Sequence, residues 1–128
     1  MQRDLQELLE TTNFATFGFR VVHADEARVR LHVPAQVSHL RPGEIVAGYV
    51  LVAAADVAVW LAIKTLLGVE DRSVTIDLHT SFLAAGASDF HCDARIVHCG
   101  RRIVTGVATA SDDARDLAVH RVSYARRE

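Results

Sequence analysis

The most constraining feature of the chain is a long apolar stretch over residues 45–63, interrupted by one charged side chain, Asp56. Alanine and leucine are frequent in it, proline is absent, and Gly68 follows, so we predict a helix over about residues 44–67. Apolar residues occur on every side of this helix, which predicts that it is buried nearly all round. A charge in such surroundings is costly unless it is paired or has a function.

Three interpretations of this stretch are open. The run is long enough to span a membrane, but its small alanines, its central Asp56 and the strand-like remainder of the chain argue against a span. In a structural interpretation, the backbone or a neighbouring arginine satisfies Asp56. In a functional interpretation, Asp56 is an acid, base or nucleophile in an apolar site where its ionisation can be tuned.

Composition limits the other possibilities. The 128 residues suit one domain over residues 1–128, with residues 1–16 as an N-terminal helix and lead-in. Lys and Arg number 14 and Asp and Glu number 16, so no basic excess favours binding to nucleic acid. Cys92 and Cys99 lie seven residues apart, on opposite faces of a predicted strand, and cannot bridge each other. Two free thiols and the lack of a signal peptide predict a cytoplasmic protein, and no metal-binding cysteine pair is present.

Hydrophobic periodicity predicts the order helix, two strands, long helix, four strands. A short amphipathic helix is expected over residues 3–11. The six strands are expected at about residues 19–24, 27–33, 73–82, 90–96, 103–110 and 117–124. The strand over residues 73–82 has the clearest alternation, with one apolar and one polar face. We therefore predict an α+β domain in which a curved antiparallel sheet wraps the long helix, and a dimer that covers the exposed sheet edge.

Several short motifs accompany this order of elements. The segment over residues 41–49 is Arg-Pro-Gly-Glu-Ile-Val-Ala-Gly-Tyr, and Ala-Ala-Asp-Val-Ala follows at residues 54–58. Residues 79–86 are His-Thr-Ser-Phe-Leu-Ala-Ala-Gly, and Gly-Arg-Arg forms a turn at residues 100–102. From about residue 17 to residue 124, the chain resembles the hotdog-fold acyl-CoA thioesterases of the phenylacetyl-CoA and 4-hydroxybenzoyl-CoA thioesterase type. It departs from their pattern at Ala47, Tyr49 and Ala84, which replace a histidine, a glycine and a basic residue.

The resemblance implies a thioester-hydrolysing site at a dimer interface. Asp56 would be the general base for a water molecule or a nucleophile that forms an anhydride, and the sequence does not separate these roles. The backbone amides of Gly48 and Tyr49, in the first turn of the helix, would hold the thioester carbonyl. Thr75 would come from the partner subunit and steer the water. A solvated polar residue on a strand is the alternative interpretation of Thr75.

The resemblance also implies contacts with coenzyme A, which is part of the substrate rather than a separate cofactor. The residues assigned to these contacts are Arg41, His79, Phe82, Arg101 and Arg102. The two arginines of the turn would meet phosphate groups, although ordinary solvated charges are the alternative. The sequence does not determine which acyl group is bound. Trp60 and the apolar helix permit an aromatic or medium-length chain, whereas Tyr49 argues against a bulky one.

The resemblance implies that the protein binds acyl-CoA and forms a homodimer or a homotetramer. Two functions are then possible. The first is an acyl-CoA thioesterase built on Asp56. The second is a binding protein for acyl-CoA or another small ligand that does not hydrolyse it, which the departures at Ala47, Tyr49 and Ala84 favour. A hydratase is a weaker alternative, because no histidine follows Asp56 in the helix.

Overall fold

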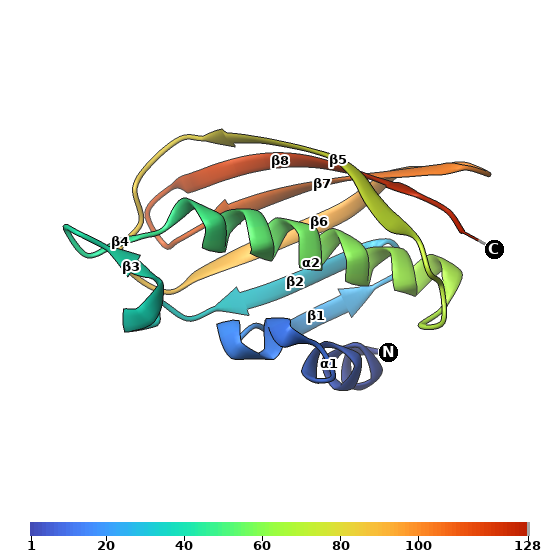
Figure 1. Ribbon diagram of the computed structural model, residues 1–128, viewed down its shortest axis with the longest axis horizontal. Coiled ribbons are helices and arrows are strands. Elements are labelled where there is room, and N and C mark those ends of the chain that lie inside the picture. The colour runs from blue at the N-terminus through green and yellow to red at the C-terminus, as the bar shows by residue number, and fades with distance from the viewer. Residues whose placement is uncertain (128) are drawn as a thin grey trace.

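In the computed structural model, which describes residues 1–127, a curved six-stranded antiparallel sheet wraps around one long helix, α2 (Gly48–Leu67) (Figure 1). The strands follow the order β1-β2-β6-β7-β8-β5, so β1 and β5 are the sheet edges. Their bounds are β1 (Arg20–Asp25), β2 (Arg28–Val33), β5 (Val74–Phe82), β6 (Phe90–Cys99), β7 (Ile103–Ser111) and β8 (Asp116–Ala125). The predicted α+β architecture is confirmed.

The N-terminal segment braces one edge of this sheet. Helix α1 (Gln2–Glu10) packs against β1 and buries Leu5 and Leu9, as the spacing of the leucines predicts (Figure 1). The remaining short elements are η1 (Asn13–Phe17), η2 (Val37–His39), β3 (Leu40–Arg41) and β4 (Ile45–Val46).

Small and branched side chains let α2 lie close to the sheet. Its buried apolar residues are Val50, Leu51, Ala54, Ala55, Val57, Ala58, Val59, Leu61, Ala62 and Ile63. Gly106 on β7 allows the closest approach, because a Cβ atom there would lie 2.8 Å from Val59 Cγ1. Helix α2 is long and apolar enough to cross a membrane, but 61% of its most apolar window is buried inside the protein. This is the packing of a core helix.

The predicted start of the long helix is wrong by four residues. The helix begins at Gly48 rather than at about residue 44, because Ile45 and Val46 pair with β3 instead. Two further hydrogen bonds hold this lead-in, since Val46 N donates to Gly86 O and Ala47 N donates to His39 O. The helix N-terminus is thereby fixed by the loops around it.

The apolar face predicted for β5 does not enter the core. Val74, Ile76 and Phe82 are 41%, 53% and 57% exposed, and only Leu78 is half-buried. A register shift between Thr75 and Asp77 disturbs the alternation, and β5 is a free edge that pairs only with β8. The sequence pattern therefore marks a surface that the single chain leaves uncovered.

Helix α2 is also less enclosed than predicted. Tyr49 is 56% exposed, and Ala53, Asp56 and Trp60 are only partly buried. These four residues have the spacing of one helical face. This arrangement favours the functional interpretation of Asp56, because the carboxylate lies at the margin of the core, where a ligand can reach it, rather than inside it.

His120 on β8 makes the fold sensitive to acid. Its side chain is buried, Nδ1 lies 2.7 Å from Thr80 Oγ1, and Nε2 has no partner among residues 1–127. Burial lowers the pKa of His120 to about 4, below its ordinary value of 6.5. The unfolded chain therefore binds the proton first, so stability is full above about pH 6.5 and is lost as the pH falls toward 4. We expect His120 to account for up to about 2 kcal/mol of this loss.

Urea unfolding between pH 7 and pH 4 tests this expectation. The His120→Gln variant should lose less stability over this range than the wild type, whereas His98→Gln, at an exposed position on β6, should follow the wild type. An unchanged acid dependence in His120→Gln would show that other groups cause it.

Candidate active site

Two hydroxyl groups fix one oxygen of Asp56. Thr75 Oγ1 donates a hydrogen bond of 2.8 Å to Asp56 Oδ1, and Tyr124 Oη lies 2.7 Å from the same oxygen. Tyr124 Oη is also 3.0 Å from the backbone oxygen of Asp56. Burial and the Asp56 carboxylate raise the pKa of Tyr124 far above its ordinary value, so its hydroxyl stays a proton donor. Within residues 1–127, Oδ2 of Asp56 accepts no hydrogen bond and is left for a ligand or water.

Asp56 lines a mostly apolar pocket of about 260 Å³ between α2, β5 and the N-terminal segment. Its walls are formed by Thr12, Phe14, Val57, Trp60, Ser73, Val74, Thr75 and Tyr124. No lysine or arginine lines this pocket, and no ion pair with Asp56 is present in the described part of the chain. The interpretation of Asp56 as a residue paired with a neighbouring arginine is therefore wrong.

The structure corrects the prediction about which subunit supplies Thr75 to the site. Thr75 was expected to reach the site from a partner subunit, but its hydroxyl contacts Asp56 of the same chain. The helix and β5 are joined by a short connection, so β5 passes directly beside the middle of α2. The carboxylate and the hydroxyl that orients it therefore form one unit within a single copy.

Tyr124 was missed by the sequence analysis. It ends an ordinary alternating strand, and its role depends on β8 pairing with β5, where Tyr124 lies opposite Thr75. Neither the strand order nor this register can be read from the β8 segment alone. Phe14 and Ser73 were missed for the same reason, since a loop and a strand end bring them to the pocket.

Removing the Tyr124 hydroxyl should reduce turnover without removing the site. In Tyr124→Phe, Asp56 keeps the Thr75 hydrogen bond but loses its second donor, so the carboxylate rotates more freely. If Asp56 transfers a proton in the reaction of this site, we expect kcat to fall about tenfold, equivalent to about 1.4 kcal/mol, with KM little changed. Steady-state kinetics on the folded variant measure this change. Wild-type kcat in Tyr124→Phe would show that Thr75 alone orients the carboxylate.

The first turn of α2 presents free backbone donors. Ala47 caps the helix without a side-chain hydrogen bond, and the amides of Gly48 and Tyr49 have no acceptor within residues 1–127. A Cβ atom on Gly48 would lie 3.3 Å from two atoms of the Phe82 ring, so glycine permits this contact. The positive end of the helix dipole and the two free amides suit a developing oxyanion.

The helix start and Asp56 cannot act on one carbonyl within a single chain. Eight residues separate Gly48 from Asp56, which is about 12 Å along the helix axis. A carboxylate, acting directly or through one water molecule, and an oxyanion donor about 3 Å from the carbonyl oxygen must reach the same carbonyl. Each half of the predicted site is therefore present, but one copy does not bring the halves together.

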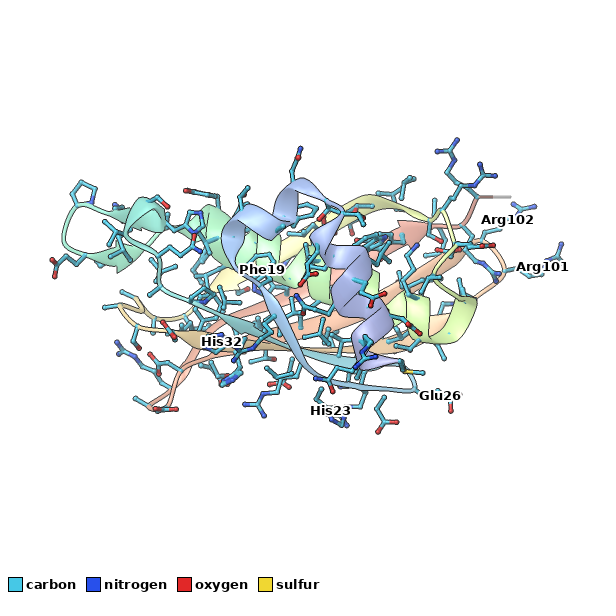
Figure 2. All side chains as sticks on the ribbon, turned by 90° about the horizontal axis from the view of Figure 1, so that it is seen from below. Phe19, His23, Glu26, His32, Arg101 and Arg102 are labelled. Carbon is cyan, nitrogen blue, oxygen red and sulfur yellow. The ribbon has the colours of Figure 1, made fainter. Side chains whose placement is uncertain are left out.

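The residues predicted to contact coenzyme A are spread over the surface. Arg41 lies on β3 near the start of α2, whereas Arg101 and Arg102 extend from the opposite end of the sheet (Figures 1 and 2). His79 is exposed on β5 opposite Arg121, and it does not line the Asp56 pocket. Phe82 lies against Gly48 at the helix start. The structure thus associates Phe82 with the amides and leaves Arg41 apart from Arg101 and Arg102 within one chain.

Comparison with known protein families shows which family the chain belongs to. The model of the thioesterase superfamily matches residues 43–119, which include α2, both free amides and Asp56. The chain belongs to the thioesterase superfamily. A comparison with curated protein sequences finds no significant match.

Solved structures of low sequence identity share the fold of this chain. A Haemophilus influenzae thioesterase has a TM-score of 0.91 at 18% identity, over 100% of this chain and 91% of that one. A conserved Pseudomonas aeruginosa protein has a TM-score of 0.90 at 22% identity, over 95% and 98%. A mutant of the phenylacetic acid degradation protein PaaI from Thermus thermophilus has a TM-score of 0.78 at 19% identity, over 88% and 96%. These likenesses establish the hotdog fold of this superfamily member.

Proposed function

We propose that this superfamily member hydrolyses acyl-CoA thioesters in a homodimer, with Asp56 of one copy acting beside the helix amides of the other. The observation that carries the proposal is the Asp56 carboxylate, with Oδ1 held by two hydroxyl groups and Oδ2 free in an apolar pocket. Such a carboxylate is oriented for proton transfer or attack and is not consumed by a structural ion pair.

The chemistry balances in either role of Asp56. As a general base, Oδ2 takes a proton from water, the water oxygen bonds to the thioester carbon, and the proton passes to the departing sulfur. As a nucleophile, Oδ2 bonds to the carbon, the carbon–sulfur bond breaks and coenzyme A leaves as a thiolate. Water then cleaves the anhydride, which releases the acid, restores Asp56 and supplies the proton that the thiolate takes up. In both cases, the amides of Gly48 and Tyr49 stabilise the negative oxygen.

A dimer supplies the missing half of the site. The free edge of β5 carries exposed Val74, Ile76 and Phe82, and the exposed face of α2 lies beside it. If two copies meet by two-fold symmetry with α2 helices that are antiparallel and overlap through their N-terminal halves, the start of one helix lies beside Asp56 of the other. The same pairing brings Arg41 of one copy toward the end of the sheet that carries Arg101 and Arg102 of the other. Together these arginines form a basic rim for the phosphates of coenzyme A.

Release of free thiol tests the proposal. The purified protein is incubated with acyl-CoA esters of aromatic, short and medium-length acyl groups, and its mass in solution is measured in parallel. We expect turnover of at least one ester by a species no smaller than a dimer. Tight binding of the esters by calorimetry with no thiol release from any of them would instead support a non-catalytic binding protein, the second function considered from the sequence. A cytoplasmic location stays a prediction.

A further inference from the structure

The outer face of the sheet carries two opposed arginines without a counter-charge. Arg28 on β2 and Arg95 on β6, here called the arginine pair, are directly opposite each other in the strand register, and both are exposed. Their neighbours Val29 and Ala94 are buried on the inner face, where β2 and β6 pack against α2. Side chains opposite each other on antiparallel strands have Cβ atoms about 4.5–5.5 Å apart, so like charges at these positions repel. Such a pair is unfavourable unless an anion binds between its members.

The nearby carboxylates do not supply this anion. Asp93 Oδ1 lies 3.6 Å from Arg30 Nε, and Asp25 Oδ2 lies 3.8 Å from His23 Nε2. Neither carboxylate forms an ion pair with the arginine pair within residues 1–127, and no other acidic side chain does so there. Two guanidinium groups are therefore left with all of their donors available on one face of the sheet.

A hollow of about 180 Å³ lies at the arginine pair. The residues that line it, besides the pair, are Asp93, Ala94, Val107 and Thr109. Val107 lies opposite Arg95 on β7, and Thr109 is half-buried, with no hydrogen bond from its hydroxyl group within residues 1–127. Guanidinium groups bind phosphate through paired N–H donors, and a hydroxyl group can add one more donor. The hollow therefore has the size and the donors for one phosphate group.

A larger polar groove continues from this hollow. Its volume is about 650 Å³, which lies in the usual range of small-molecule sites. The residues that line both the groove and the hollow are Arg28, Asp93 and Ala94. His23, Arg30 and His91 also line the groove, and Figure 2 shows His23 on the side of the sheet that faces away from α2. Imidazole rings and guanidinium planes can stack on a base, and their N–H groups can bind a sugar hydroxyl.

We propose that the outer face of the sheet binds a phosphate ester of nucleotide size, with a phosphate group between Arg28 and Arg95 and the rest of the molecule in the adjoining groove. No residue of the hollow or the groove lines the Asp56 pocket, so this site is separate from the candidate active site. The inference does not depend on the thioesterase proposal. Two sources have this chemistry, a free nucleotide and the nucleotide end of coenzyme A, and the experiment distinguishes them.

Calorimetric titration with ADP tests the inference, in a buffer of low ionic strength because salt screens exposed charges. The wild type should bind ADP more tightly than inorganic phosphate, since the groove contacts the nucleoside. Arg28→Gln and Arg95→Gln should each weaken ADP binding about tenfold, the effect of losing a charge-assisted hydrogen bond. Arg20→Gln is the matched control, because it removes an exposed charge from β1 without lining the hollow or the groove. It should bind ADP as the wild type does.

Thermal unfolding provides a second readout. Without ligand, Arg28→Gln and Arg95→Gln should be at least as stable as the wild type, because each substitution removes the repulsion between like charges. ADP should raise the Tm of the wild type and leave that of the two variants nearly unchanged. A lower Tm of both variants without ligand would contradict the repulsion from which the site is inferred.

A comparison of ADP with 3′,5′-ADP separates the two sources. Tighter binding of ADP supports a free nucleotide as the ligand, and tighter binding of 3′,5′-ADP supports the nucleotide end of coenzyme A. The proposal is overturned if the wild type binds neither nucleotide, if it binds them no more tightly than inorganic phosphate, or if both arginine variants bind them as the wild type does. None of these outcomes affects the thioesterase proposal, which thiol release tests separately.

Discussion

Asp56→Asn should lower kcat/KM for thioester hydrolysis at least about a hundredfold, the usual contribution of a positioned proton-transfer group. Asparagine has nearly the same shape, and its oxygen can still accept the hydrogen bonds from Thr75 and Tyr124. It can neither take a proton from water nor form an anhydride. The loss should therefore appear in turnover while the fold is retained, as thiol release and thermal unfolding of the same preparation measure.

Asp77→Asn is the matched control for this result. Asp77 lies on the same edge strand, two residues from Thr75, and its exposed carboxylate is 3.7 Å from Arg121. The substitution removes one negative charge of the same kind near the site, and we expect nearly wild-type turnover. Equal losses in the two variants would point to a general charge effect, and full turnover in Asp56→Asn would remove Asp56 from the mechanism.

Asp71→Asn should destabilise the fold by about 3 kcal/mol, the lower end of the cost of breaking a buried ion pair. Asp71 Oδ2 lies 3.9 Å from Lys64 Nζ, and the two side chains are only 8% and 3% exposed. Lys64 Nζ also donates to the Asp71 backbone oxygen and lies 5.2 Å from the centre of the Trp60 ring. Burial lowers the pKa of Lys64 and Asp71 opposes this effect, so the variant leaves a buried ammonium group without its counter-charge. Urea unfolding at pH 7 measures the change.

An exposed ion pair provides the comparison. Arg30 Nε lies 3.6 Å from Asp93 Oδ1, and these side chains are 47% and 46% exposed. Asp93→Asn should therefore cost less than about 1 kcal/mol. If Asp71→Asn and Asp93→Asn lost similar stability, the buried Lys64–Asp71 pair would not stabilise the connection between α2 and β5 more than an exposed ion pair does.

Hydrophobic pattern was sufficient for most of the fold, because each element has a strong local signal. The leucine spacing of α1, the apolar length of α2 and the alternation in β2, β6, β7 and β8 each reflect a face that the single chain buries. The start of α2 was misplaced because Ile45 and Val46 are as apolar as the helix, and only their pairing with β3 removes them from it.

The candidate site could be predicted only in part. Asp56 stands out in the sequence because it is the single charge in an apolar helix. Tyr124 does not stand out, since its contact with Asp56 depends on strand pairing. The alternation of β5 predicted a core face, but this face is exposed in the single chain, because the same alternation is produced by a buried face and by an exposed apolar one.

The most direct test of the account is complementation between two inactive variants in one dimer. Asp56→Asn removes the carboxylate, and Gly48→Pro removes one amide donor at a helix position where proline is tolerated. The two chains would be co-expressed with different tags and the mixed dimer isolated. Because one of its two sites combines an intact Asp56 with intact amides, the mixed dimer should recover about half of the wild-type rate. A mixed dimer as inactive as its two parents would contradict a site shared between copies.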